Sequence, residues 1–354
     1  MTVVDCGQHT FKVLKNEDLR ERCFENFKLL RTPGSFRESL INEAFWNEIL
    51  GRSERQQRQL IVSLPISSLR SAREELCAFL FEKCLGSQTS VCILSSTFLA
   101  TLGAGLSTAL VIDIGEEGTR VTPVDEGYPL PHCSAHGRIG GAALTSQMVE
   151  ILKAQSPEPN ASSAGSWAVA ESAKERFAWV AQDFNVELQR LKTEVVAPAS
   201  LTTTRSSEMD QMIREKGFTC GELLFDMRST AALAGDTLPE LVMSSLRLQS
   251  NINLRGKLLG NMLLVGGTAN LPGIHTRLVS EVRAQSKWVA PGQPLDMVKT
   301  VMFEKPSGDA SASPASLACL GGSLLAECTA VKDLSITRAA YQQYGPQVVH
   351  QMFL

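Results

Sequence analysis

The chain contains short apolar runs that end at a glycine, and one such run occurs twice. Residues 3–7 read Val-Val-Asp-Cys-Gly and residues 111–115 read Val-Ile-Asp-Ile-Gly. Apolar, β-branched residues favour strands, and a glycine allows the chain to turn sharply. Each run therefore predicts a buried strand that bends into a second strand, which carries Thr10 and Lys12 in one case and Thr119 and Arg120 in the other.

An aspartate stands at each predicted bend. Two such bends facing each other can cradle a polyphosphate, because backbone N–H groups meet phosphate oxygens while the carboxylates hold a divalent ion through water. A single Asp-x-Gly after a strand is typical of an ordinary turn, so the two runs alone do not establish a phosphate site.

A third run changes this interpretation. Residues 261–274 read Asn-Met-Leu-Leu-Val-Gly-Gly-Thr-Ala-Asn-Leu-Pro-Gly-Ile, which predicts a strand, a glycine corner and a helix that starts after Pro272. A Gly-Gly-Thr corner lets a flat ring or a ribose approach the backbone closely. Strand, phosphate turn, phosphate turn and glycine corner, in that order, resemble the layout of the superfamily of actin, heat-shock chaperones and sugar kinases.

Within that superfamily the chain resembles actin and the actin-related proteins over nearly its whole length. The matching segments are Glu126–His132 after the second turn, Ile139-Gly-Gly141 before a helix, Lys174–Ala181, Leu320–Leu325 and Tyr341–His350. The match is weakest at residues 16–60 and 185–255. The resemblance implies an α/β, actin-like ATPase fold, with duplicated ribonuclease H-like domains around a nucleotide cleft and a shortened outer subdomain 2.

The resemblance also implies the domain boundaries. Residues 1–103 and 317–354 would form the small domain, with subdomain 1 and a reduced subdomain 2 at about 16–60. Residues 104–316 would form the large domain, with subdomain 4 at about 142–235. Local patterns add a strand at 60–65, an amphipathic helix at 71–85, a helix at 43–50, and loops at 156–166 and 306–315.

Composition agrees with a large globular protein. The 354 residues are 44% hydrophobic, which suffices for a sizeable core and two domains. A net charge of −3 predicts no general attraction to nucleic acid, and we expect no membrane insertion and no signal peptide. The nine cysteines are scattered within apolar runs and predict small buried side chains in a reducing compartment. Arg52, Arg55 and Arg58 predict a solvated helix face or a protein contact.

The family's nucleotide contacts map onto individual positions of this chain. The resemblance implies nucleotide binding by Asp5, Gly7, Lys12, Asp113, Gly115, Lys174, Glu175, Gly266, Gly267 and Thr268. Lys12 would neutralise phosphate charge, and Asp5 and Asp113 would hold the water shell of Mg²⁺. The expected cofactor is ATP or ADP with Mg²⁺, acting as a structural ligand that stabilises the fold by mass action.

Other positions depart from the family, and these departures concern hydrolysis. By ungapped counting from Asp113, the family's glutamine and histidine fall on Ser96 and Arg120. Serine is too short to orient the attacking water, and arginine cannot accept its proton. We therefore expect no catalytic residues and very slow or absent hydrolysis. Two further departures from the family disfavour tight nucleotide binding. Gln8 replaces a serine beside the phosphates, and Ala315 takes the place of a lysine that packs on adenine.

The segment between Asp5 and Ile61 is several tens of residues shorter than in actin. The missing part corresponds to the outer subdomain, which carries the pointed-end loop of a filament subunit. A cleft for docking onto a neighbour looks retained, and the resemblance implies that its walls include Leu102, Gly105, Gly127, Tyr128, Leu325 and Leu334. A subunit of this kind can join a filament through its cleft but offers little to a further subunit.

Three functions remain open at this stage. The first is a non-polymerising actin-related subunit that caps the pointed end of the actin-like filament of dynactin, in the cytoplasm and on the cytoskeleton. Its partners would be the filament subunit of dynactin and other pointed-end subunits, in support of dynein transport. The second is a nuclear actin-related subunit of a chromatin-remodelling complex. The third, a self-polymerising ATPase, is disfavoured by Ser96, Arg120 and the missing outer loop.

Overall fold

A computed structural model describes the protein over most of its length. The described residues are 2–7, 10–16, 22–28, 40–50, 59–85, 89–155, 163–194, 211, 213–226, 237–286, 295–302 and 313–353. Contacts divide the chain into two compact units. Unit 1 comprises Met1–Val111, Thr122–His132 and Met302–Leu354, and unit 2 comprises Ile112–Val121 and Cys133–Val301. These limits differ from the expected domain boundaries, which lie between residues 103 and 104 and between residues 316 and 317. The domain assignment taken from the resemblance stays a prediction.

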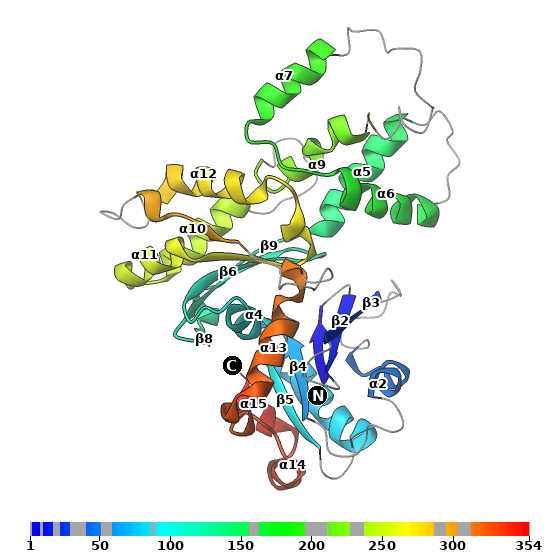
Figure 1. The fold of residues 1–354 in the computed structure, drawn as a ribbon, viewed down its shortest axis with the longest axis vertical. Coiled ribbons are helices and arrows are strands. Elements are labelled where there is room, and N and C mark those ends of the chain that lie inside the picture. Colours follow the sequence, from blue (N-terminus) through cyan, green and yellow to red (C-terminus); the bar gives the residue numbers. More distant parts are fainter. Residues whose placement is uncertain are drawn as a thin grey trace. The chain divides into compact units, whose positions relative to one another are not determined.

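Unit 1 contains a five-stranded sheet with the order β3-β2-β1-β4-β5 (Figure 1). Its strands are β1 (Thr2–Cys6), β2 (Thr10–Asn16), β3 (Arg22–Lys28), β4 (Gln59–Leu64) and β5 (Ser90–Ser95). The first three strands are antiparallel neighbours, and β4 pairs in parallel with both β1 and β5. The strand expected at residues 3–7, the second strand that follows it and the strand at 60–65 are confirmed.

Alternate residues of these strands enter two separate apolar cores. Val4 and Val62 lie in one core with Trp46 of α2, whereas Val3 and Ile61 lie in the other. Because successive strand side chains point to opposite faces, the two cores cover the two faces of the sheet. The helices of unit 1 are α2 (Glu43–Leu50), α3 (Arg70–Phe79) with a π-turn at Leu80–Cys84, α4 (Ser96–Gly103), α13 (Leu317–Glu327), α14 (Arg338–Tyr344) and α15 (Val349–Met352).

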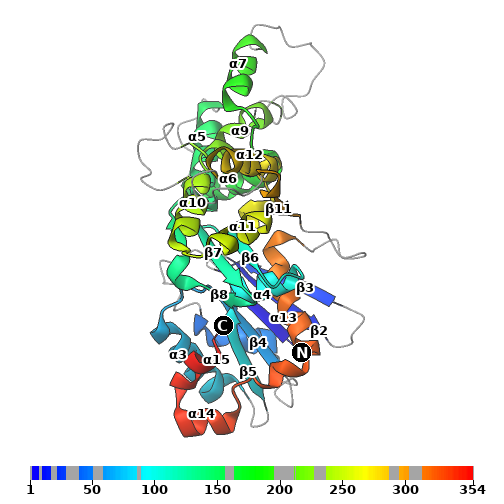
Figure 2. The same ribbon diagram turned by 90° about the vertical axis from the view of Figure 1, so that its left-hand side faces the viewer.

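Helices α4 and α13 pack against each other on one face of the sheet (Figure 2). Two glycines allow their backbones to approach closely. A Cβ atom at Gly321 would overlap the carbonyl oxygen of Leu99, and one at Gly103 would overlap that of Leu317. Side chains larger than hydrogen therefore cannot occupy these two positions without separating the helices.

A second sheet has the order β11-β10-β6-β7-β8, and β9 also pairs with β7. Its strands are β6 (Ala109–Ile114), β7 (Thr119–Asp125), β8 (Tyr128–Pro129), β9 (Ala135–Gly137), β10 (Met262–Val265) and β11 (Thr300–Val301). Strands β6 and β7 contribute residues to both units. The strand predicted at residues 111–115 and the strand before the glycine corner are therefore confirmed.

The helices of unit 2 come mostly from the middle of the chain. They include α5 (Gly141–Gln155), α6 (Ser163–Phe177), α7 (Phe184–Glu194), α9 (Phe218–Glu222), α10 (Leu238–Leu248), α11 (Ile252–Gly260) and α12 (Ile274–Ser286). Helix α12 confirms the helix expected after Pro272. The loop expected at 156–166 is wrong at its end, since α6 already begins at Ser163, a residue type favoured where helices start.

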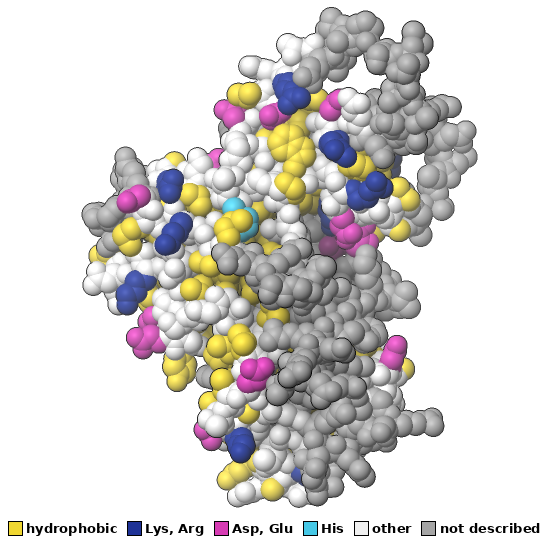
Figure 3. Space-filling view, viewed as in Figure 1, with side chains coloured by type: hydrophobic (Ala, Val, Ile, Leu, Met, Phe, Trp, Pro, Cys, Tyr) yellow, Lys and Arg dark blue, Asp and Glu magenta, His cyan; other side chains and the backbone are white. Residues whose placement is uncertain are grey.

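Some predictions fall outside the described residues or are only partly covered by them. Arg52, Arg55 and Arg58 lie outside them, as does Gln8. The helix predicted at 43–50 is present as α2, and the helix predicted at 71–85 is present as α3 and its π-turn. Among the described helices, none is long and apolar enough to cross a membrane. On the face seen in Figure 3, the described basic and acidic side chains are interspersed.

Candidate functional site

The first candidate phosphate turn lies in unit 1, between β1 and β2. The strand register places Asp5 directly opposite Lys12. Asp5 is buried, with 8% of its surface exposed. Its Oδ1 accepts a hydrogen bond from the Ser63 hydroxyl at 2.6 Å, and its Oδ2 lies 3.7 Å from Lys12 Nζ. Gly7 follows the strand, and its N–H donates to the Asp5 carbonyl at 3.2 Å.

The second candidate turn lies in unit 2, between β6 and β7. The Gly115 N–H donates to the Gly118 carbonyl at 3.0 Å, which closes the hairpin. In an antiparallel hairpin closed at these residues, Asp113 stands opposite Arg120. Burial lowers the pKa of the Arg120 guanidinium, while the Asp113 carboxylate acts in the opposite direction.

The glycine corner lies directly against this second turn. Gly266 has φ +93°, which favours glycine, and a Cβ there would lie 2.5 Å from the Ile114 carbonyl oxygen and 2.9 Å from Asp113 Oδ1. In contrast, a Cβ at Gly267 would have no neighbour within 4 Å. The structure therefore brings the predicted corner and the second turn together, and the backbone at Gly267 is open.

Lys174 enters the same part of unit 2 from α6. Its Nζ donates to the Gly141 carbonyl at 3.1 Å and to Thr145 Oγ1 at 2.9 Å, and lies 3.9 Å from Glu116 Oε2. A Cβ at Gly141 would lie 3.2 Å from Thr268 Oγ1 and 3.4 Å from Lys174 Nζ. Seven of the predicted nucleotide-binding residues lie in the described part of unit 2. Six of them are placed around the second turn or the glycine corner, and the seventh, Glu175, has an exposed side chain.

Sequence reasoning missed Glu116 and Thr145 in this group. Glu116 follows the glycine of the turn, so its place beside the Lys174 amine depends on how α5 and α6 pack. The N-terminus of α5 is held on the turn by hydrogen bonds of 2.8 Å from Gly141 N to Gly115 O and from Ala142 N to Glu116 O. Two glycines at 140 and 141 would have been the only local signal.

The residues present give Mg²⁺ a poor fit. Asp5 already accepts from Ser63 and faces Lys12, and Asp113 faces Arg120. Each predicted carboxylate therefore has a cation of the chain beside it, and no step is assigned to a metal.

The two positions expected to lack hydrolytic function are also described. Ser96 is the first residue of α4, where the preceding Ser95 accepts a hydrogen bond from Phe98 N at 3.1 Å and so caps the helix. Arg120 lies in β7. Ala315 lies in a 3₁₀ turn at Pro314–Ser316. Slow or absent hydrolysis stays a prediction.

The six residues predicted to line a partner cleft all belong to unit 1. Leu325 is buried in the core between α4, α13 and the sheet, and Leu102 and Leu334 pack against that core while partly exposed. Tyr128 on β8 is 63% exposed. A Cβ at Gly127 would lie 3.9 Å from the Phe98 ring. Of the six predicted residues, Leu325 is therefore part of the buried core. Gly105 is exposed and follows Leu102 by three positions, and Tyr128 is the exposed aromatic residue of the set.

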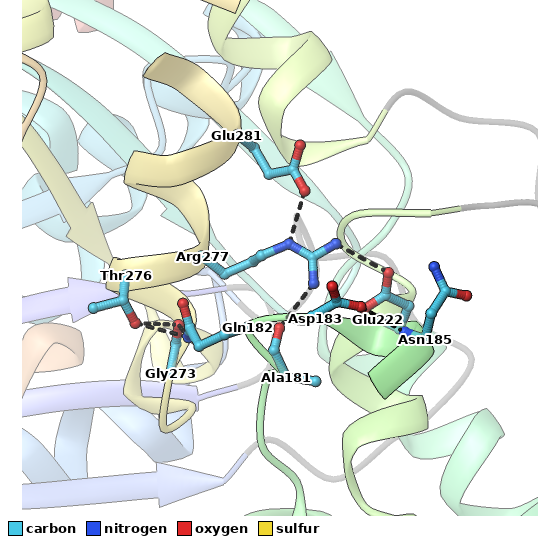
Figure 4. A network of polar contacts seen from close by, with 9 residues as sticks. All are labelled: Ala181, Gln182, Asp183, Asn185, Glu222, Gly273, Thr276, Arg277 and Glu281. Carbon is cyan, nitrogen blue, oxygen red and sulfur yellow. Dashed lines mark hydrogen bonds and ion pairs between the residues drawn. The ribbon is translucent and has the colours of Figure 1, made fainter. Parts of the chain in front are cut away.

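A polar network in unit 2 was not predicted at all (Figure 4). Arg277 of α12 donates through Nε to Glu281 at 2.8 Å and through Nη1 to the Ala181 carbonyl at 2.8 Å, and Nη2 lies 3.3 Å from Glu222 Oε1. Glu222 is buried, and its Oε2 has no hydrogen-bond partner. Burial raises the pKa of Glu222, and Arg277 partly opposes this.

Comparisons with known proteins agree with this architecture. The family model described as Actin matches residues 35–354. The chain belongs to the actin family, and its fold is the α/β, actin-like fold expected from the resemblance.

Three relatives illustrate the degree of similarity. Actin-like protein 9 of Bos taurus is 26% identical over 312 residues, which cover 87% of this chain and 69% of that protein. Actin-like protein 9 of Homo sapiens is 27% identical with the same coverage. Putative actin-29 of Dictyostelium discoideum is 23% identical over 316 residues, covering 89% of this chain and 76% of that protein.

Proposed function

We propose that this chain is a non-polymerising actin-related protein that caps the pointed end of the actin-like filament of dynactin and so supports dynein-based transport. The observation that carries the proposal is an asymmetry in unit 1. Leu102 of α4 and Tyr128 of β8 are at least partly exposed, as a docking surface requires, whereas the segment between Asp5 and Ile61 is shorter than in actin. The protein would be a hetero-complex subunit in the cytoplasm and on the cytoskeleton.

The contact surface has the character of a protein interface. Tyr128 offers a large amphipathic ring that is 63% exposed, and Leu102 and Leu334 are partly exposed over a buried core. Exposed tyrosines next to packed apolar residues are frequent sources of binding energy in interfaces. We infer that the neighbouring filament subunit docks here.

Nucleotide would serve this subunit as a structural ligand. Lys12 in unit 1, and Lys174, Gly267 and Thr268 in unit 2, support binding of ATP or ADP by the charges and open backbone that they supply. Hydrolysis is expected to be very slow or absent, because Ser96 and Arg120 cannot position and deprotonate water. A phosphate-release assay of the purified chain tests this, and turnover comparable with actin would refute it.

A nuclear actin-related subunit of a chromatin-remodelling complex is the alternative. Members of that kind also lose hydrolysis, but they commonly carry insertions, and this chain is shortened. The two proposals name different partners and different compartments, so one experiment separates them.

That experiment is affinity purification of the tagged full chain from its own cells, followed by mass spectrometry. Recovery of an actin-related filament subunit with capping protein and dynein-associated chains is the expected result. Recovery of remodelling ATPases and nuclear actin would refute the dynactin role. Tyr128→Asp should reduce recovery of the filament subunit, whereas Tyr344→Asp, which alters a tyrosine of unit 1 that is 56% exposed, should not.

A further inference from the structure

The two hairpins carry the same pair of charges at the same offset. In the first hairpin the register pairs Asp5 with Lys12. In the second, the hydrogen bond from Gly115 to Gly118 sets a register in which Asp113 pairs with Arg120. Directly opposite residues in antiparallel strands point to the same face. Each turn therefore presents a carboxylate with a cation of the chain beside it.

The other titratable groups described around Arg120 do not alter its pairing with Asp113. On the β9 side, Arg120 is the register partner of His136, whose pKa is lowered by burial and by Arg120 and Arg138. That imidazole is therefore neutral at neutral pH. Glu116, the acidic residue in the turn itself, lies 3.9 Å from Lys174 Nζ. On the β10 side, the neighbour of Asp113 is the glycine corner, which carries no charge and is open at Gly267.

We propose that Arg120 is a phosphate ligand in unit 2, equivalent to Lys12 in unit 1, and that its fixed charge makes polyphosphate binding by this chain largely independent of Mg²⁺. This inference rests on the proposed nucleotide binding. A guanidinium carries five N–H donors in a planar fork that matches a phosphate group. A carboxylate already beside a fixed cation also attracts a divalent ion less strongly, which agrees with the poor metal fit of Asp5 and Asp113.

Arg120 then has a positive role in function. As a replacement for a hydrolytic histidine, Arg120 explains only what the chain cannot do. As a phosphate ligand, it favours a nucleotide that stays bound when Mg²⁺ is scarce. Such behaviour suits a ligand whose role is structural, since its loss would remove the stabilisation that binding supplies.

The test is nucleotide binding by the full-length chain, freed of bound nucleotide, with a fluorescent ATP analogue in buffers containing either Mg²⁺ or EDTA. For the unaltered chain, the Kd in EDTA should lie within about threefold of the Kd in Mg²⁺, a difference well below 1.4 kcal/mol. Arg120→His should raise the Kd in EDTA by about 10- to 100-fold, the usual effect of losing a hydrogen bond to a charged group. Arg120→Lys should restore most of the affinity.

The matched control is Arg138→His, which removes an exposed arginine of the same unit and should leave both Kd values unchanged. Thermal unfolding of each variant checks that it folds. If Arg120→His does not fold, the affinity of Arg120→Lys and the Mg²⁺ dependence of the unaltered chain still test the role of Arg120. A loss of affinity above tenfold in EDTA for the unaltered chain, or equal binding by Arg120→His, overturns the inference. Absence of binding under both conditions overturns nucleotide binding itself, whereas the purification experiment tests the dynactin role independently.

Discussion

The close packing of α4 on α13 leads to a quantitative prediction for Gly321→Ala. The new methyl group would overlap the Leu99 carbonyl oxygen and would lie 2.7 Å from the Leu99 carbonyl carbon and 2.9 Å from Gly103 N. All three are backbone atoms, which cannot rotate away as a flexible side chain can. The two helices must therefore separate, and the apolar core that contains Leu99, Cys319 and Leu325 must loosen.

The magnitude follows from two opposing effects. Overpacking costs about 1–3 kcal/mol, and a clash with backbone on both helices belongs at the upper end, about 3 kcal/mol. Replacing glycine by alanine within a helix contributes about 1 kcal/mol in the other direction. We expect a net loss of about 2 kcal/mol, which corresponds to a decrease in Tm of about 4–8 °C for a unit of this size.

The assay is thermal and urea unfolding of the full chain followed by circular dichroism. Ser323→Ala is the matched control on the same helix, because the buried Ser323 hydroxyl has no hydrogen-bond partner. Its removal should raise stability by about 1 kcal/mol. An unchanged or increased Tm for Gly321→Ala would refute the close approach of the two backbones, and a lower Tm for Ser323→Ala would refute the assignment of an unsatisfied hydroxyl.

Three further predictions concern other parts of the chain. Because the pKa of Glu222 is raised in the folded state, its contribution to stability is greatest below its ordinary pKa of 4.5 and is lost as pH rises through the raised value. The stability of Glu222→Gln relative to the unaltered chain should therefore increase as pH rises above 4.5, as urea unfolding at a series of pH values would show. Gly266→Ala should lower Tm by several degrees, because φ +93° and the neighbouring strand both oppose a side chain, whereas Gly267→Ala should fold normally in the same thermal scan. A short maleimide pulse on the folded chain should modify the exposed Cys328 before the seven other described thiols, which are buried, as peptide mass spectrometry would show.

The parts of the structure that local patterns determine could be predicted from the sequence. Both Asp-x-Gly hairpins, the strand before Gly266 and the helix at 43–50 depend on neighbouring residues, and their periodicity or their glycines were sufficient signals. The small buried cysteines were also predicted correctly for the seven that are described as buried, and burial raises the pKa of Cys77 and Cys220 to about 12.

Contacts between distant segments could not be predicted in this way. Glu222 and Arg277 are 55 positions apart, and neither stands in a pattern that names the other. Glu116 reaches Lys174 only because α5 and α6 bring the two together. The π-turn at Leu80–Cys84 also contacts a distant residue, since Arg338 donates to the carbonyls of Phe81 and Leu85 at 2.8 and 2.9 Å.

The composition of unit 1 from both halves of the chain has a consequence for synthesis on the ribosome. One face of β1 and β4 is covered by α13, and Val91 of β5 is bridged to Ile336, so the early strands need late residues to complete their packing. At about 5–20 residues per second, a nascent chain needs roughly 10–40 s to extend from residue 111 to residue 302. During that interval the apolar face that α13 later covers is exposed, and we expect the unfinished polypeptide to bind chaperones through it.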